Sequence, residues 1–83
     1  MIKVILEIIK DTDDNPNNED HYRCFEESKN DMELYLNKYA KHGILPNIGD
    51  TLIGTNNDNT VSDYKVCEKL FSEQGIWIYV EWF

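Results

Sequence analysis

The chain of 83 residues lacks several features that would by themselves indicate a function. It contains a single arginine, Arg23, and its four glycines stand apart from one another, so we expect neither a basic nucleic-acid surface nor a glycine-rich phosphate loop. No apolar run approaches the length of a membrane span, and the N-terminus does not resemble a signal peptide. We therefore expect a cytoplasmic protein without direct contact to nucleic acid or membrane.

Cysteine is scarce as well. The two cysteines, Cys24 and Cys67, both lie in segments where apolar and polar residues alternate. Because the cytoplasm keeps thiols reduced, we expect two free and partly buried thiols rather than a disulfide.

Acidic residues are abundant and concentrated in one stretch. Residues 11–33 carry a net charge of −7 out of −8 for the whole chain, with Arg23 and Lys29 as their only cations. Such a surface repels anions and attracts basic partners. The nine acids are Asp11, Asp13, Asp14, Glu19, Asp20, Glu26, Glu27, Asp31 and Glu33.

Length and patterning predict one α+β domain spanning residues 1–83. Residues 2–9 alternate with apolar residues on both faces, which indicates a central strand. Later strands are expected just after a tight turn at Gly49-Asp50, over residues 61–71, and from residue 75 to the end. A hairpin should join the last two, with Gly75 in a left-handed conformation.

A helix is predicted over residues 30–42. Asn30 followed by Glu33 resembles a capping box, and Gly43 with Pro46 favours an end at residue 42. The spacing of four apolar residues predicts a buried face: Met32, Tyr35, Leu36 and Tyr39.

Residues 21–27 are ambiguous. We favour a strand, because Ser28, Asn30 and Asp31 suit a helix start better than a helix middle. The absence of Val, Ile and Thr from residues 13–43 instead favours one long helix over residues 19–42. The expected fold is a curved antiparallel sheet or small barrel of four to five strands with one helix. Its order is β-β-α-β-β-β, or β-α-β-β-β if the helix is long.

No cofactor, metal or catalytic site is expected. Asp11, Asp13, Asn15, Asn17 and Glu19 alternate as in a calcium loop, but Pro16 and Tyr22 stand where an EF-hand has glycine and glutamate. His21 and Cys24 are spaced for zinc without a second pair. No motif places a base beside either cysteine.

We therefore expect a small acidic, non-enzymatic module that binds a basic protein surface. The expected contact residues are Asp11, Asp13, Asp14, Glu19, Asp20, Glu26 and Glu27. The alternative is an inhibitor that imitates nucleic acid and blocks a DNA- or RNA-handling protein. Short acidic chains rich in Asn and Lys are typical of AT-rich bacteria, their phages and their mobile elements, which is the origin we expect.

Overall fold

The computed structural model describes residues 3–9 and 18–82, with side chains from residue 22 onward in the second range. Its elements are β1 (Lys3–Ile8), α1 (Asn18–Lys41), β2 (Thr51–Thr55), β3 (Val61–Phe71) and β4 (Gly75–Trp82). The fold class is α+β, and the order β-α-β-β-β matches the alternative with one long helix. The preferred order, with a strand over residues 21–27, is wrong.

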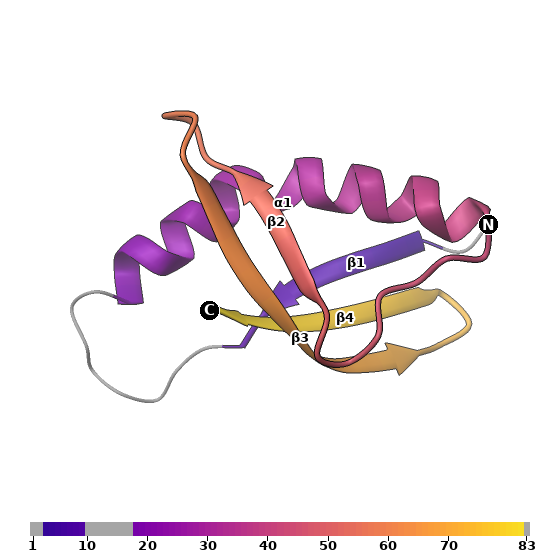
Figure 1. The fold of residues 1–83 in the computed structure, drawn as a ribbon. Coiled ribbons are helices and arrows are strands. Elements are labelled where there is room, and N and C mark those ends of the chain that lie inside the picture. Colours follow the sequence, from indigo (N-terminus) through magenta and orange to yellow (C-terminus); the bar gives the residue numbers. More distant parts are fainter. Residues whose placement is uncertain (1–2, 10–17, 83) are drawn as a thin grey trace.

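The four strands form one mixed sheet in the order β1-β4-β3-β2 (Figure 1). The expected antiparallel pairing is correct for β2 with β3 and for β3 with β4, but β4 pairs parallel with β1. β1 was expected to be central and instead lies at an edge of the sheet.

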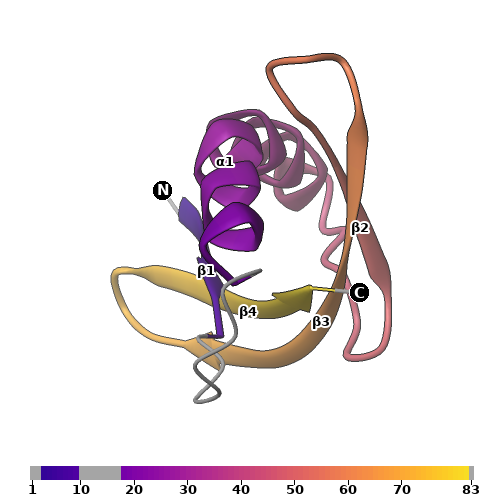
Figure 2. The ribbon, with the colours of Figure 1, turned by 90° about the vertical axis from the view of Figure 1, so that its left-hand side faces the viewer.

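The sheet curls into a half-barrel, and α1 lies in its concave side (Figure 2). β3 produces much of this curl, because its first half pairs with β2 and its second half pairs with β4. A bulge between Val66 and Glu68 separates the halves and reverses the alternation of side chains. Tyr64 and Val66 are therefore buried, whereas Leu70, which an unbroken alternation over residues 61–71 would place on the same side, is 45% exposed.

The core lies between α1 and the concave face of the sheet. Ile76, Ile78 and Val80 of β4 point into it, while Trp77 and Tyr79 lie half-buried on the outer face, which α1 does not cover. The buried apolar residues are Val4, Leu6, Phe25, Met32, Leu36, Leu52, Tyr64, Val66, Ile76, Ile78 and Val80.

Residues 21–27 are helical because their buried side belongs to the same core. Phe25 packs edge-to-face on Tyr64, with ring centroids 5.6 Å apart. Ser28 is fully buried, and its hydroxyl donates to the carbonyl of Cys24 at 3.0 Å, which satisfies a polar residue inside the helix. Asn30, the expected cap, lies mid-helix.

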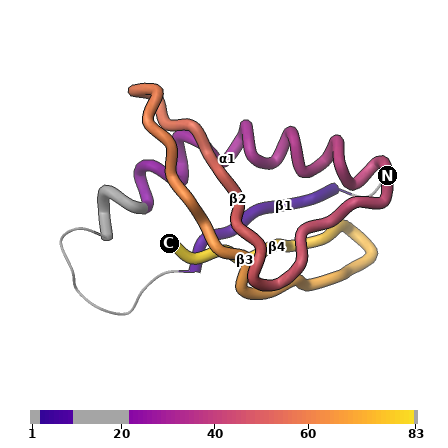
Figure 3. Tube along the Cα trace, in the orientation of Figure 1, coloured from indigo at the N-terminus to yellow at the C-terminus, as the bar shows by residue number. Residues whose placement is uncertain are grey.

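α1 changes direction near its middle, where β2 crosses it (Figures 1 and 3). A bond from a serine hydroxyl to the carbonyl four residues earlier often bends a helix, and Ser28 makes such a bond. Gly54 of β2 lies directly against Ser28: a Cβ at Gly54 would stand 2.7 Å from the Ser28 Oγ. The glycine is therefore required by close packing.

The second half of α1 bonds to both edges of the sheet. On β1, the Asn37 Oδ1 accepts from the Val4 N–H at 2.9 Å, and the Glu33 Oε2 accepts from the Leu6 N–H at 2.9 Å. On β2, the Tyr35 hydroxyl donates to the Ile53 carbonyl at 3.1 Å. These bonds occupy edge groups that would otherwise be open to pairing with another strand.

Gly75 was expected to be left-handed, but its φ is not positive in the structure. It begins β4 beside Lys3 of β1, and a Cβ there would collide with the Lys3 carbonyl oxygen. The glycine permits the close approach of the two parallel strands.

Candidate functional site

Of the seven predicted contact residues, the structure describes the side chains of two, Glu26 and Glu27. Asp11, Asp13 and Asp14 lie outside the described residues, as does most of the calcium-like loop. Glu19 and Asp20 lie in the first turn of α1, without described side chains. Glu26 is exposed and Glu27 is half-buried on the same helix.

Glu26 and Glu27 share the outer surface of α1 with Asp31, which is also exposed. We call these three residues the acidic face. No described lysine forms an ion pair with them, and Lys29 of the same helix lies 3.9 Å from Glu7 of β1 instead. Glu33 belongs to the same acidic stretch but bonds to β1, so its carboxylate serves the fold.

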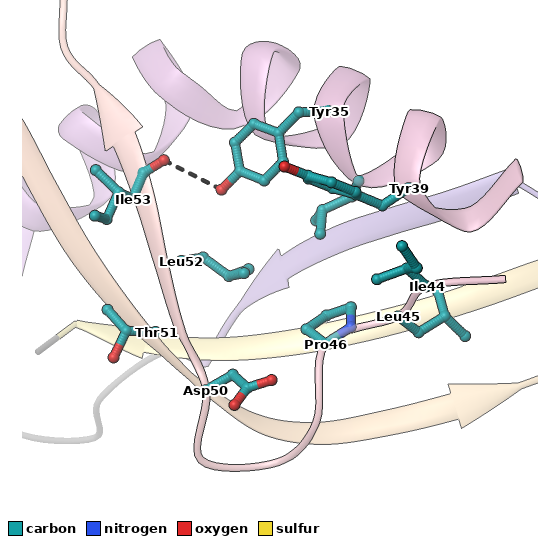
Figure 4. A pocket seen from close by; sticks show the side chains of 10 residues that line it. Tyr35, Tyr39, Ile44, Leu45, Pro46, Asp50, Thr51, Leu52 and Ile53 are labelled. Atoms are coloured by element: carbon teal, nitrogen blue, oxygen red, sulfur yellow. Dashed lines mark hydrogen bonds between the residues drawn. The ribbon is translucent and has the colours of Figure 1, made fainter. Parts of the chain in front are cut away.

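A second feature is a groove that opens beside the second half of α1. It has a volume of about 420 Å³ and lies between α1, the segment that follows it and β2 (Figure 4). We call it the tyrosine groove. Its lining consists of Tyr35, Leu36, Tyr39, Ile44, Leu45, Pro46, Asp50, Thr51, Leu52 and Ile53.

The end of α1 builds one wall of the tyrosine groove. Gly43 has a φ of 76°. The Gly43 N–H donates to the Ala40 carbonyl and the Ile44 N–H to the Tyr39 carbonyl, both at 3.0 Å, which is a Schellman motif. The predicted role of Gly43 just after the end of the helix is thereby confirmed, and the motif brings Ile44 beside Tyr39 on the groove wall.

A tight turn builds the far end of the groove. The Asp50 N–H donates to the Asn47 carbonyl at 3.0 Å, and Gly49 has a φ of 96°, which confirms the predicted turn. The Asp50 Oδ2 accepts from the Asn47 N–H at 2.7 Å. Asp50 is thereby held at the end of the groove opposite the tyrosines (Figure 4).

The two tyrosines differ in their surroundings. Their rings meet edge-to-face, with centroids 6.3 Å apart. Burial raises the pKa of Tyr35, whose hydroxyl donates to the Ile53 carbonyl. Tyr39 is 52% exposed, so its expected place in the core is wrong, whereas Met32 and Leu36 are buried as expected.

Neither metal chemistry nor nucleophilic catalysis finds support in the described side chains. They contain no group of three or more His, Cys, Asp or Glu residues placed to hold a metal ion. Both cysteines are free and half-buried, as expected. Burial, and to a lesser degree Glu81, raises the pKa of the Cys67 thiol, which is the opposite of what a reactive thiolate requires.

A comparison with protein-family models, curated proteins and solved structures found no match to this chain. Within the described residues, no helix combines the length and apolarity of a membrane span. The function of the protein must therefore be argued from the acidic face and the tyrosine groove.

Proposed function

We propose that this protein is a non-enzymatic binding module whose acidic face contacts a basic surface of another protein. One observation carries the proposal: Glu26, Glu27 and Asp31 lie on the outer side of α1 without an ion pair to any described lysine. Like charges one helical turn apart, such as Glu27 and Asp31, destabilise a helix slightly. A basic partner would turn this small cost into a gain.

The acidic face is suited to fast, salt-sensitive association. Exposed charges steer an oppositely charged partner and lose this effect beyond about 8 Å at physiological ionic strength. Glu19 and Asp20 on the same helix, and Asp11, Asp13 and Asp14 before it, extend the negative field in our proposal. The two free cysteines support a reducing compartment, and we place the protein in the cytoplasm.

A narrower form of the proposal is imitation of nucleic acid. It is favoured by the position of the acids along the outer side of one helix rather than in a concave cluster. The partner would then be a DNA- or RNA-handling protein with a basic groove. An excess of duplex DNA or of RNA should compete with the module for such a partner much more strongly than for a basic partner that does not handle nucleic acid.

The test compares two variants with the same change in net charge. The first neutralises the acidic face by Glu26→Gln, Glu27→Gln and Asp31→Asn. The control neutralises three exposed acids elsewhere by Asp63→Asn, Glu68→Gln and Glu73→Gln. Proteins captured from lysate by wild-type protein are identified at about 0.05 and 0.5 M salt.

We expect basic proteins to be captured at low salt by the wild type and the control, and to be lost from the acidic-face variant. Equal loss from both variants would show that only net charge matters and would refute the assignment to α1. Capture by all three proteins, indifferent to salt, would refute it as well.

A further inference from the structure

The tyrosine groove lies next to the acidic face along one line of the helix. Glu27, Asp31, Tyr35 and Tyr39 follow one another at intervals of four residues. Residues with this spacing are neighbours on a helix surface, and the last three span about 12 Å of its length. A partner held by the acidic face therefore has the groove within reach of its next side chains.

The groove has the composition of a site for a cation with an apolar stem. Asp50 is the only charged residue among those that line it, and the cations at the end of α1, Lys38, Lys41 and His42, are absent from its lining. The Asp50 Oδ2 accepts from the Asn47 N–H, and the Oδ1 has no hydrogen bond among the described residues. One carboxylate oxygen is therefore free to accept from a ligand.

The aromatic end offers a second contact for such a ligand. The exposed ring of Tyr39 is open to packing by an aliphatic stem. The walls between the tyrosines and Asp50 are apolar, with Pro46 and Leu52 among them. An aliphatic stem would be covered there while its charged head reaches a polar end.

Apolar exposure at the rim also points to an occupant. Ile44 is 55% exposed and Ile53 is 56% exposed, on opposite sides of the groove. Apolar side chains that gather around a concave site are a sign of binding rather than of scattered surface residues. The volume of about 420 Å³ lies in the range of about 300–1,000 Å³ found for pockets that bind small groups.

We propose that the tyrosine groove receives an arginine side chain of the basic partner. The guanidinium binds the Asp50 carboxylate at one end of the groove, and the aliphatic stem crosses the apolar walls and packs against the exposed Tyr39 ring at the other end. Arginine fits better than lysine, because its planar head donates several N–H groups toward a carboxylate and is more weakly hydrated than an ammonium group. This inference rests on the proposed function for the basic character of the partner, but the groove can be tested without that partner.

The test uses a small probe and its uncharged isostere. N-acetyl-L-arginine N-methylamide is titrated into isotopically labelled protein, and amide shifts are followed by NMR. The matched probe is the citrulline analogue, which has nearly the same shape without the charge. We expect the arginine probe to shift the amides of Tyr39, Ile44, Thr51 and Ile53, and the citrulline probe to leave them nearly unchanged.

Two variants identify the contacts. Tyr39→Leu keeps an apolar side chain but removes the ring, and Asp50→Asn keeps an oxygen for the Asn47 N–H but removes the charge. Each should weaken binding of the probe about two- to fivefold. The control Asp63→Asn changes the net charge equally at an exposed position on β3 and should bind like the wild type.

Equal binding of both probes, or binding unaffected by Tyr39→Leu and Asp50→Asn, would overturn the proposal. Probe shifts confined to the acidic face would do the same and would leave the proposed function intact. The acidic-face variant separates the two claims: it should still bind the probe in the groove while losing the basic partners. Loss of the basic partners without probe binding would leave only the proposed function.

Discussion

The two halves of α1 are held to the sheet in different ways. The first half contacts the β2–β3 hairpin by close packing, with Ser28 against Gly54 and Phe25 against Tyr64. The second half adds polar bonds to both sheet edges through Glu33, Asn37 and Tyr35. Glu26, Glu27 and Asp31 take no part in these contacts, and we infer that they remain available to a partner.

The largest loss of stability is expected in the hydrophobic core that both halves of α1 share. Leu36→Ala should lower the free energy of unfolding by about 2–5 kcal/mol, because Leu36 is 3% exposed and its loss leaves a cavity. Chemical denaturation checks this value. Leu34→Ala on the same helix is the matched control, since Leu34 is 62% exposed and should cost far less. Equal losses would contradict the assigned orientation of α1.

Close packing in the first half is tested at Gly54. Gly54→Ala should cost about 1–3 kcal/mol of unfolding free energy, because the new methyl group would lie 2.8 Å from the Ser28 Cβ. Adding Ser28→Gly should recover part of that loss, measured as a coupling energy in a double-mutant cycle. Independent effects of the two substitutions would mean that the helix and β2 are not in this contact.

The polar bonds of the second half are tested at Glu33. Glu33→Ala should lower the free energy of unfolding by about 1–3 kcal/mol, because the Leu6 N–H then loses a charged acceptor. Glu33→Gln keeps an oxygen acceptor and should lose less. A thermal melt in which Glu33→Ala is as stable as the wild type would remove the distinction between Glu33 and the acidic face.

The smallest effect concerns the buried tyrosine that contacts the first half. Burial raises the pKa of Tyr64, and its hydroxyl lies beside those of Ser28 and Ser62 without a hydrogen bond of good geometry to either. Its folded pKa therefore exceeds the unfolded value of about 10. The stability that this shift contributes is complete below about pH 10 and is lost as the pH rises through the folded pKa.

Tyr64→Phe should accordingly reduce the alkaline fall in unfolding free energy while changing stability little at neutral pH. Denaturation curves collected from about pH 8 to pH 12 check this expectation. An unchanged alkaline fall would show that Tyr64 does not contribute to it.

Much of the fold follows from local patterns in the sequence. The strand over residues 61–71 matches β3, and the end of α1 follows from Gly43, which adopts the left-handed conformation typical of this position. The preferred order of elements, with a strand over residues 21–27, is wrong, and the alternative with one long helix is correct. Packing decided it, because the burial of Phe25 and Ser28 depends on β2 and β3, which lie far along the chain.

The edge position of β1 could not be predicted from its residues. Apolar residues on both faces usually indicate a central strand, but here Asn37 and Glu33 satisfy the free edge. These two residues are indistinguishable in sequence from ordinary surface residues of a helix. The bulge in β3 likewise has no local signal, so the exposure of Leu70 was not predicted.

The candidate sites were predictable to different degrees. The charge of the acidic face can be counted in the sequence, whereas its separation from Glu33 depends on which side of α1 faces β1. The tyrosine groove is lined by residues of α1 and of the turn and strand that follow it. Its only signal in the sequence is the apolar run Ile44-Leu45-Pro46 after Gly43. The groove exists only because the chain between Ile44 and Ile53 folds back along α1, and the sequence does not indicate this path.

The central claim is that the four described acidic side chains of α1 divide into one that holds the fold, Glu33, and three that do not. The most direct measurement is the free energy of unfolding of the Glu26→Gln, Glu27→Gln, Asp31→Asn variant at neutral pH and low salt. We predict a value equal to that of the wild type or slightly higher, since the repulsion between Glu27 and Asp31 is removed. A loss comparable to that of Glu33→Ala would contradict the account, because these acids would then serve the fold.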